Sequence, residues 1–520
     1  MLAHPEDSLL ADGRALSDLM QGVTLEVMGE FSMGPLNQKM KERMVEREGD
    51  IKYPVTWTTL AEYLETLERR GISPNVGSFV GASTIRTFVL GEADVQPIAS
   101  QITDMRALVH RAMEDGALGV TTMLIYAPAT YAKTPELIAL AQESARCGGI
   151  YTVHMRSEGD RIESALQETI DIAAASGGPA EIYHLKVAGK DNWGKLDRVV
   201  ASIEKARASG IRISADMYDY TAGATGLDAA MPPWVQDGGL EAWIQHLKDP
   251  AVRARVIAEM RDPHPGSWEN LYGAAGAEGT LLLAFKNPKL KPLTGKSLAE
   301  VAKERGVSPE DAAVDLVIED GSRVGIAYFL MNENNIRRQV ALPWVSFGSD
   351  ESGDAPEGVF LLSGAHPRAY GNFARVLAEI CAQGTCFEPR GGGTQAHRPA
   401  RGQSIAARSR PAQSRGFRRH RGLRSEHDPR PRHLPKTASV KYRGELRHRE
   451  RQDGRKGRTA HRGRDRSSGA WASVDRGGER RLPRRRERLV LVPVKSVRTS
   501  RARPSRRRAT PGQPTMTSLI

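Results

Sequence analysis

"GIYTVHM" at residues 149–155 and "AEIYHLKV" at residues 180–187 are the stretches that decide the fold. Each is a short apolar run rich in β-branched and aromatic side chains, which is typical of a buried β-strand. Each also carries a histidine at or near its end, His154 in the first and His184 in the second. Because strands that are apolar on both faces belong to parallel sheets, the pair predicts a helix-covered sheet with chemically active residues at its carboxyl edge.

Runs of the same kind recur along residues 20–350 and alternate with stretches of helical length. Residues 56–71 repeat their apolar side chains every three and four positions, and residues 308–321 begin with Ser308 as a helix N-cap. About eight strand–helix units predict an α/β protein with a (β/α)8 barrel similar to a TIM barrel. The other predicted strands begin at residues 22, 75, 116, 210, 280, 324 and 342.

The mouth of such a barrel would gather residues from distant parts of the sequence. Tyr218 and Asp350 end two of the predicted strands, as the two histidines do, and the carboxyl ends of all barrel strands face one side. The stretch at residues 228–278 is too long for a simple connection, so we predict a lid or an inserted subdomain there. We expect the barrel domain as a whole to span residues 1–380.

The composition restricts the class of protein. Lys and Arg number 75 against 62 Asp and Glu, a formal net charge of +13, but the basic residues concentrate after residue 380 and leave the barrel region acidic. The 3 cysteines indicate a reducing compartment rather than a disulfide framework. The sequence shows neither a membrane-spanning apolar run nor a secretory leader. We therefore expect a cytoplasmic protein without a membrane partner.

Two histidines on adjacent strand ends suit a divalent metal ion. Ligation needs neutral imidazoles held in fixed directions, and neighbouring barrel strands supply that rigidity. His154 and His184 are therefore the predicted ligands, although a single histidine at a strand end is often structural. Asp350 follows a run that should be buried, and it could either cap the next loop or accept a proton from a metal-activated water.

Long motifs in a fixed order carry a family resemblance. They are "QGVTLEVMGE" from residue 21, "GALGVTTMLIYAPATYA" from 116, "HMRSEG" from 154, "YHLKVAG" from 183, "DMYDYTAGATGLDAAMPP" from 216, "VSFGSD" from 345 and "HPRAYGNFARVL" from 366. In this order, and with the same separation between the two histidines, the sequence resembles the N-acyl-D-amino-acid deacylases (D-aminoacylases) of the amidohydrolase superfamily. The resemblance covers roughly residues 10–380.

The resemblance implies a zinc-dependent barrel enzyme, flanked by a small β-sandwich, that cleaves the amide bond of N-acyl-D-amino acids. It implies that His154 and His184 hold one tightly bound zinc ion, and that Asp350 activates water and then protonates the leaving amine. The expected partner is the small-molecule substrate, whose carboxylate suits a guanidinium group. The residues implied to bind this substrate are Lys186, Tyr218 and Arg368.

The turn after the strand at residues 22–28 departs from the family. Relatives have a zinc-binding Cys in a turn similar to "GNCG", whereas this sequence reads "MGEFSMGP" at residues 28–35. Glu30 is the nearest carboxylate, and we predict that it replaces the thiolate as a metal ligand. Ala224 stands where the family has Ser, and Asp219 where Pro is commoner, so the acyl and side-chain preferences stay open.

The start of the sequence also differs from the family. Members have a first barrel strand that ends in His-x-His before the point where this chain starts, and His4 alone does not supply that pair. We therefore expect the chain as written to lack the first barrel strand, through a late start or a truncation. We also expect it to lack the flanking β-sandwich, because the reading frame shifts before the C-terminal strands of that sandwich.

Residues 381–520 look unlike the rest of the chain. Arg, Pro, Gly and Ser dominate them, with scarcely an aliphatic run, so they cannot bury enough apolar surface to fold and should be disordered. A shift of one nucleotide, with synonymous codons, lets residues 381–400 read as an amphipathic helix and later residues as alternating strands with an "NG" turn. We interpret this basic tail as an out-of-frame translation that begins near Cys381.

Three alternatives stay open at the level of the sequence. A cyclic-amide hydrolase resembling dihydroorotase or hydantoinase would share the barrel. A nucleic-acid-binding protein would use the basic tail, although an out-of-frame origin of that tail argues against nucleic acid as a partner. An inactive gene remnant would account for the shifted frame.

Overall fold

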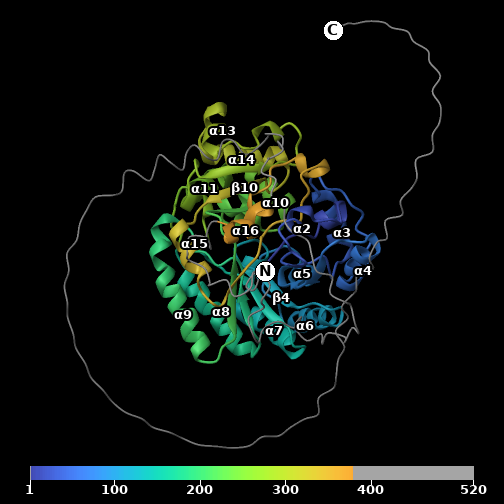
Figure 1. Ribbon diagram of the computed structural model, residues 1–520. Coiled ribbons are helices and arrows are strands. Elements are labelled where there is room, and N and C mark those ends of the chain that lie inside the picture. Colours follow the sequence, from blue (N-terminus) through green and yellow to red (C-terminus); the bar gives the residue numbers. More distant parts are fainter. Residues whose placement is uncertain (1, 379–520) are drawn as a thin grey trace, which may run out of the picture. The chain divides into compact units, whose positions relative to one another are not determined.

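The computed structural model describes residues 2–378, and a parallel sheet lies at its centre (Figure 1). Within these residues, six strands pair in the order β11-β7-β6-β5-β4-β3, and β1 pairs with β2 in a separate parallel ladder. Phe79 alone separates β2 from β3, and its amide donates to the Met28 carbonyl of β1 at 2.8 Å. These strands are β1 (Leu25–Met28), β2 (Asn75–Ser78), β3 (Val80–Gly81), β4 (Gly119–Met123), β5 (Ile150–His154), β6 (Ala180–Ile182), β7 (Ile213–Met217) and β11 (Val345–Phe347).

Residues 2–4 close the ring of strands between β1 and β11. Leu2 forms a parallel bridge with Val27, and the Ala3 amide donates to the Val27 carbonyl at 2.9 Å. On the other side, the Asp350 amide donates to the Leu2 carbonyl at 2.9 Å. The ring position that we expected to be empty therefore holds these residues, and the strands complete a barrel.

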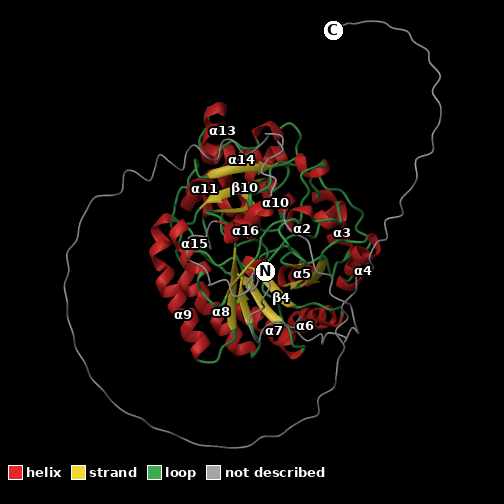
Figure 2. Cartoon of the chain, in the orientation of Figure 1, coloured by secondary structure: helices red, strands yellow, loops and turns green. Residues whose placement is uncertain are grey.

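Helices cover the outside of the barrel strands, as Figure 2 shows with helices in red and strands in yellow. Each of α7, α8 and α9 connects two consecutive parallel strands, which is the strand–helix alternation predicted from the sequence. Side chains without exposed surface, such as Val153, Ile182 and Val199, fill the core. The helices of this part are α3 (Gln38–Arg47), α4 (Leu60–Arg70), α5 (Ala82–Leu90), α6 (Ala99–Glu114), α7 (Thr134–Arg146), α8 (Ile162–Ser176) and α9 (Leu196–Ala208).

The two helices with the clearest sequence signals are confirmed. α4 begins where the Thr59 side chain caps it, reciprocally with Glu62, and ends at Gly71, whose φ of 77° is open to glycine. Ser308 caps α14 (Pro309–Asp320) with its side chain, as predicted.

Between β7 and β11 the chain leaves the barrel and forms an antiparallel sheet in the order β8-β10-β9. We predicted barrel strands at residues 280–285 and 324–330; both contain strands, but their assignment to the barrel is wrong, because they pair in this separate sheet. The lid or subdomain predicted near residues 228–278 lies within the same segment, whose α13, α14 and β10 group together in Figure 1. Its elements are β8 (Ala222–Gly226), η3 (Leu227–Ala230), η4 (Pro233–Gln236), α10 (Leu240–Lys248), α11 (Pro250–Met260), α12 (Leu271–Ala275), β9 (Thr280–Ala284), η5 (Lys291–Leu293), α13 (Leu298–Arg305), α14, β10 (Gly325–Phe329) and α15 (Glu333–Val340).

Short helices connect the two ends of the described chain. The Gln21 side chain, just after α2, donates to the Ala369 carbonyl and accepts the Phe373 amide, each at 3.0 Å, so it joins α2 to α16. The basic tail at residues 381–520 lies outside the described residues. The remaining short elements are α1 (Ser8–Ala11), α2 (Leu16–Leu19), η1 (Ala129–Tyr131), η2 (Lys190–Lys195), η6 (Gly358–Leu361) and α16 (Arg368–Arg375).

Glu26 of β1 is a buried carboxyl group to which no described residue donates a hydrogen bond. Burial, followed by the charges of Asp18 and Glu6, raises its pKa from 4.5 to about 9. The folded state therefore binds a proton that the unfolded state releases, so stability present below pH 4.5 is lost as the pH rises toward 9. We predict that Glu26→Gln raises the free energy of unfolding by roughly 2 kcal/mol at pH 8 and by little at pH 4, measured by urea denaturation. Equal stability of variant and parent at pH 8 would contradict this.

Candidate metal centre

His154 and His184 lie at the carboxyl ends of adjacent strands and face each other. His154 is the last residue of β5, His184 follows β6, and their buried rings have centroids 4.4 Å apart with planes at 82°. His184 has a left-handed backbone with φ of 38°, and the Asp216 carboxylate accepts its amide hydrogen at 2.5 Å. This hydrogen bond fixes the turn after β6, and the turn places the His184 imidazole beside that of His154.

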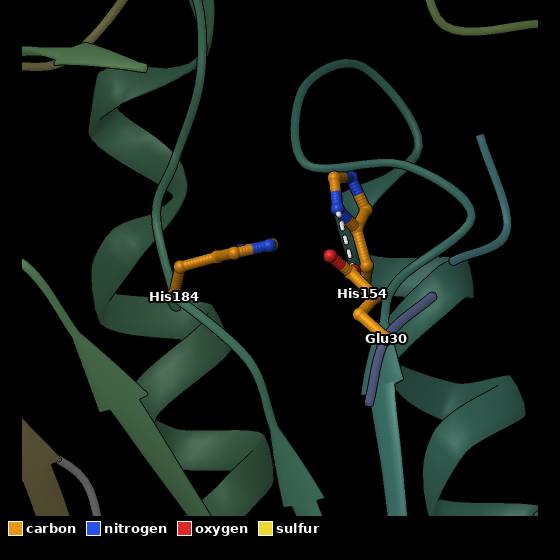
Figure 3. A group of neighbouring side chains, drawn as sticks. All are labelled: Glu30, His154 and His184. Carbon is orange, nitrogen blue, oxygen red and sulfur yellow. Dashed lines mark ion pairs between the residues drawn. The ribbon is translucent and has the colours of Figure 1, made fainter. Parts of the chain in front are cut away.

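Glu30 joins the two histidines, and Figure 3 shows the three side chains with the ion pair between Glu30 and His154. Its Oε1 lies 3.6 Å from His154 Nδ1, and the candidate ligand atoms of all three residues lie within 4.8 Å of one another. The turn before Glu30 needs Gly29, whose φ is 116° and whose Cβ position would collide with the backbone of Phe79. The structure thus places the predicted ligand Glu30 beside both predicted histidines.

The donor atoms of this group fit zinc. Among the described residues, Oε1 of Glu30 and Nε2 of His154 are buried without a hydrogen-bond partner, so each keeps a lone pair free. Burial lowers the pKa of His154, which favours the neutral imidazole. Burial would raise the pKa of Glu30, but its polar contact with His154 and the charge of His4 keep that pKa below its ordinary value. Two imidazole nitrogens and a carboxylate oxygen are ligands that zinc takes in catalytic sites.

His4 forms a second group, with Glu30 and Asp350, that the sequence analysis did not include. Its Nε2 lies 3.4 Å from Glu30 Oε2 and 3.2 Å from Asp350 Oδ1. Burial lowers the pKa of His4, but the hydrogen bond to Asp350 and the charge of Glu30 outweigh it and raise the pKa to about 9. The sequence carried one signal for this residue, a histidine near where the family has His-x-His, but no strand was predicted there.

The other predicted site residues contact one another and the metal group. Arg368 Nη1 lies 2.9 Å from Asp350 Oδ2, and its guanidinium lies 4.4 Å from the Tyr218 ring centroid. Lys186 Nζ lies 5.5 Å from that centroid and 2.7 Å from His184 Nδ1. Burial would raise the pKa of Asp350, but the charges of Arg368 and His184 hold it well below its ordinary range. The structure therefore brings all the predicted site residues together, with Asp350 ionised.

No family model matches this chain, but comparison with curated proteins finds several that are similar to it. A D-aminoacylase of Alcaligenes xylosoxydans xylosoxydans is 31% identical over 379 residues, which cover 72% of this chain and 66% of that protein. The chain belongs to the D-aminoacylase family. An N-acyl-D-aspartate deacylase of the same organism is 27% identical over 72% of this chain and 64% of its own length. The chain thus spans slightly less than two thirds of these D-aminoacylase relatives.

Solved structures agree with the fold. A D-aminoacylase studied for its binuclear metal center superposes with a TM-score of 0.57 at 29% identity, over 74% of this chain and 69% of that one. An N-acyl-D-glutamate deacylase of Bordetella bronchiseptica, complexed with zinc and a phosphonate inhibitor, gives a TM-score of 0.56 at 23% identity, over 74% and 70%. The prediction of an α/β barrel of the TIM type is confirmed.

Ala224 and Asp219 are the two positions at which we expected a departure from the family. Ala224 lies in the middle of β8 and pairs with Ala327 of β10. Asp219 is fully buried, its amide donates to Asn372 at 3.1 Å, and its carboxylate lies 3.7 Å from Arg375 Nη1. Asp219 therefore connects the end of β7 with α16.

Glu158 belongs to the site although the sequence analysis missed it. It is 3% exposed, and its Oε1 lies 3.0 Å from His184 Nδ1. The available signal was an acidic residue four positions after His154 in the quoted motif "HMRSEG".

None of the helices in the described part combines the length and the hydropathy that a membrane span requires.

Proposed function

We propose that this chain hydrolyses the amide bond of N-acyl-D-amino acids with one tightly bound zinc ion, releasing a carboxylate and a D-amino acid. The observation that carries the proposal is the buried group of Glu30, His154 and His184 beside the ionised Asp350. The relatives, a D-aminoacylase and two deacylases of N-acyl-D-glutamate and N-acyl-D-aspartate, support the substrate class.

The group of Glu30, His154 and His184 is where we place the zinc ion. Zinc, when bound, supplies a Lewis acid for the acyl carbonyl and for the attacking water. The study of a related D-aminoacylase that describes one-metal activation and second-metal attenuation supports a single activating ion. His4, Glu30 and Asp350 could form a second metal site, but we expect it to be weaker because Asp350 is already paired with Arg368 at 2.9 Å.

Asp350 moves the proton in this proposal. Its carboxylate accepts a proton from water as the water oxygen bonds to the acyl carbon. The same proton passes to the amine nitrogen as the carbon–nitrogen bond breaks, so water divides between the carboxylic acid and the amine. The low pKa of Asp350 keeps the carboxylate ionised and ready for the first transfer.

Three buried side chains hold the substrate. Arg368 and Lys186 are the cations nearest the Tyr218 ring, so they attract the α-carboxylate of an N-acyl-amino acid. The Tyr218 hydroxyl stays protonated, because burial raises its pKa well above the ordinary value. It can therefore donate a hydrogen bond to an oxygen that gains negative charge.

Arg368→Met should raise KM for an N-acetyl-D-amino acid by about 10- to 100-fold, because a hydrogen bond to a charged group contributes about 1.5–3 kcal/mol. Initial-rate kinetics on the zinc-loaded chain measure this. Arg198→Met is the matched control, since Arg198 pairs with Glu163 on the outer helices with its side chain 60% exposed. A KM within twofold of the parent chain for Arg368→Met would remove Arg368 from substrate binding.

The deciding assay offers the zinc-loaded full-length chain N-acetyl-D-methionine and measures released D-methionine with a D-amino-acid oxidase reaction. We expect turnover of the D-enantiomer and none of N-acetyl-L-methionine, dihydroorotate or hydantoin. Turnover of a ring substrate alone would replace the proposal by the cyclic-amide alternative. Zinc binding without any turnover would favour the inactive remnant.

The reading frame near Cys381 is a separate proposal that rests on the sequence. We propose that residues 381–520 arise from a shift of one nucleotide and that the cytoplasmic enzyme continues in the other frame. Sequencing the gene from upstream of Met1 to its end tests this. An inserted or lost base near codon 381 is the expected result, and an intact frame would make the basic tail part of the protein.

A further inference from the structure

Glu158 lies behind the candidate metal centre, on the loop that follows β5. Its carboxylate Oε1 lies 2.7 Å from Lys186 Nζ and 3.0 Å from His184 Nδ1, and its Oε2 lies 3.8 Å from His154 Nε2. It therefore touches both predicted histidine ligands and a proposed substrate residue. No role in the hydrolysis described above uses it.

The position of Glu158 is fixed by its backbone. Its amide donates to Glu269 Oε1 at 2.9 Å, and its carbonyl accepts the Ala188 amide at 2.7 Å. The first bond ties the loop to the segment outside the barrel, and the second ties it to the strand end that carries His184 and Lys186. A carboxylate held from both sides can orient its neighbours without reorganising.

The hydrogen bonds around His184 depend on where its single ring proton lies. Nδ1 has two neighbours, Glu158 Oε1 at 3.0 Å and Lys186 Nζ at 2.7 Å. If Lys186 donated to Nδ1, the ring proton would sit on Nε2, and Nε2 could not bind a metal. If Nδ1 carries the proton and donates to Glu158, Nε2 keeps its lone pair, and Lys186 donates to Glu158 instead.

Only the second arrangement prepares His184 for a metal ion. It needs one acceptor that takes hydrogen bonds from both His184 and Lys186, and Glu158 is that acceptor. Figure 3 shows the His184 side chain directed toward those of Glu30 and His154. Histidine ligands commonly donate their second ring N–H to a carboxylate, which sets the tautomer and strengthens the ligand.

We propose that Glu158 is a positioning residue that holds His184 in its metal-binding tautomer and Lys186 in place for the substrate. This inference rests on the proposed function for the identity of the metal and of the substrate. It predicts two separable effects, one on zinc affinity through His184 and one on KM through Lys186.

Glu158→Gln is the test, because the amide keeps the shape of the side chain but loses the negative charge that strengthens the hydrogen bonds from His184 and Lys186. We expect the zinc dissociation constant, measured by competition with a chromogenic chelator, to rise about 10- to 100-fold. Glu143→Gln is the matched control. Glu143 is a largely buried carboxylate on α7 that pairs with Arg106 at 2.9 Å and Arg146 at 3.1 Å. Its zinc affinity should stay within twofold of the parent chain.

A third variant separates the two contacts of Glu158. Lys186→Met should raise KM and leave the zinc dissociation constant within about threefold, whereas Glu158→Gln should raise both. Zinc affinity of Glu158→Gln equal to that of the control would overturn the inference, whatever happens to activity. Zinc binding is measured without turnover, so failure of the deacylase proposal would not mask this result.

A measurement on the unaltered chain covers the case in which Glu158→Gln does not fold. With 15N-labelled histidine, long-range proton–nitrogen NMR of the metal-free protein reports which ring nitrogen of His184 carries the proton. We expect a proton on Nδ1, with the signal assigned by its loss in His184→Gln. A proton on Nε2 would overturn the inference.

Discussion

Asp350→Asn will lower kcat/KM for N-acyl-D-amino acid hydrolysis by about 100- to 10,000-fold, which is the range for loss of a general acid–base group. The amide cannot accept the proton from water or return it to the amine. The Asp350 carboxylate is suited to both transfers, because Arg368 lies 2.9 Å from one oxygen and His4 lies 3.2 Å from the other. Initial rates on zinc-loaded protein measure the loss.

The zinc content of Asp350→Asn shows whether its activity is lost because proton transfer fails or because zinc no longer binds. We expect about one tightly held zinc ion per chain, because Asp350 is outside the group of Glu30, His154 and His184. Asp315→Asn serves as the control: Asp315 pairs with Arg253 at 2.6 Å on α14, within the segment outside the barrel. Activity of Asp350→Asn within tenfold of the parent chain would remove Asp350 from the proton transfers.

Glu30→Gln should weaken zinc binding by more than about 100-fold and abolish activity at limiting zinc, since it removes a proposed direct ligand and not only a supporting contact. Glu30 belongs to both candidate groups, so this substitution removes a carboxylate from each of them. Its carboxylate also lies 3.6 Å from His154 and 3.4 Å from His4. Chelator competition gives the affinity, and activity with added zinc gives the functional loss.

A second carboxylate controls for general effects of the Glu30 substitution. Glu48→Gln changes a buried carboxylate that accepts the Tyr53 amide at 3.2 Å and takes no part in either group. It should bind zinc as the parent chain does. If Glu30→Gln also held zinc with unchanged affinity, the metal would have to be bound by other residues, and the proposed centre would be wrong.

The strands that carry the predicted site were readable from the sequence. β5 and β6 are apolar runs whose short length and β-branched and aromatic side chains distinguish them from helices, and their histidines then fall near equivalent strand ends. Asp350 followed in the same way from the apolar run before it. In these cases the deciding information is local, because side-chain periodicity and turn residues act over a few positions.

The errors have one physical origin. The runs at residues 280–285 and 324–330 contain strands, but an apolar run does not encode which strand it pairs with, and here the partner is β8 in an antiparallel sheet. His4 was not assigned to the site because no strand was predicted around it, and Glu158 was not assigned because an acidic residue on a loop is common. Their importance comes from neighbours that are distant in the sequence.

Local patterns and long motifs were enough to predict an α/β barrel that resembles the D-aminoacylases, with His154, His184 and Asp350 at strand ends. Such features depend on local patterns and on long motifs, which the chain carries whether or not it is folded. Only in the folded chain do residues 2–4 close the ring and bring His4 to Glu30 and Asp350. Only there does Glu158 lie against His184 and Lys186. Contacts between residues far apart along the chain depend on how the strands close, and that is set by packing of the whole barrel rather than by any single stretch.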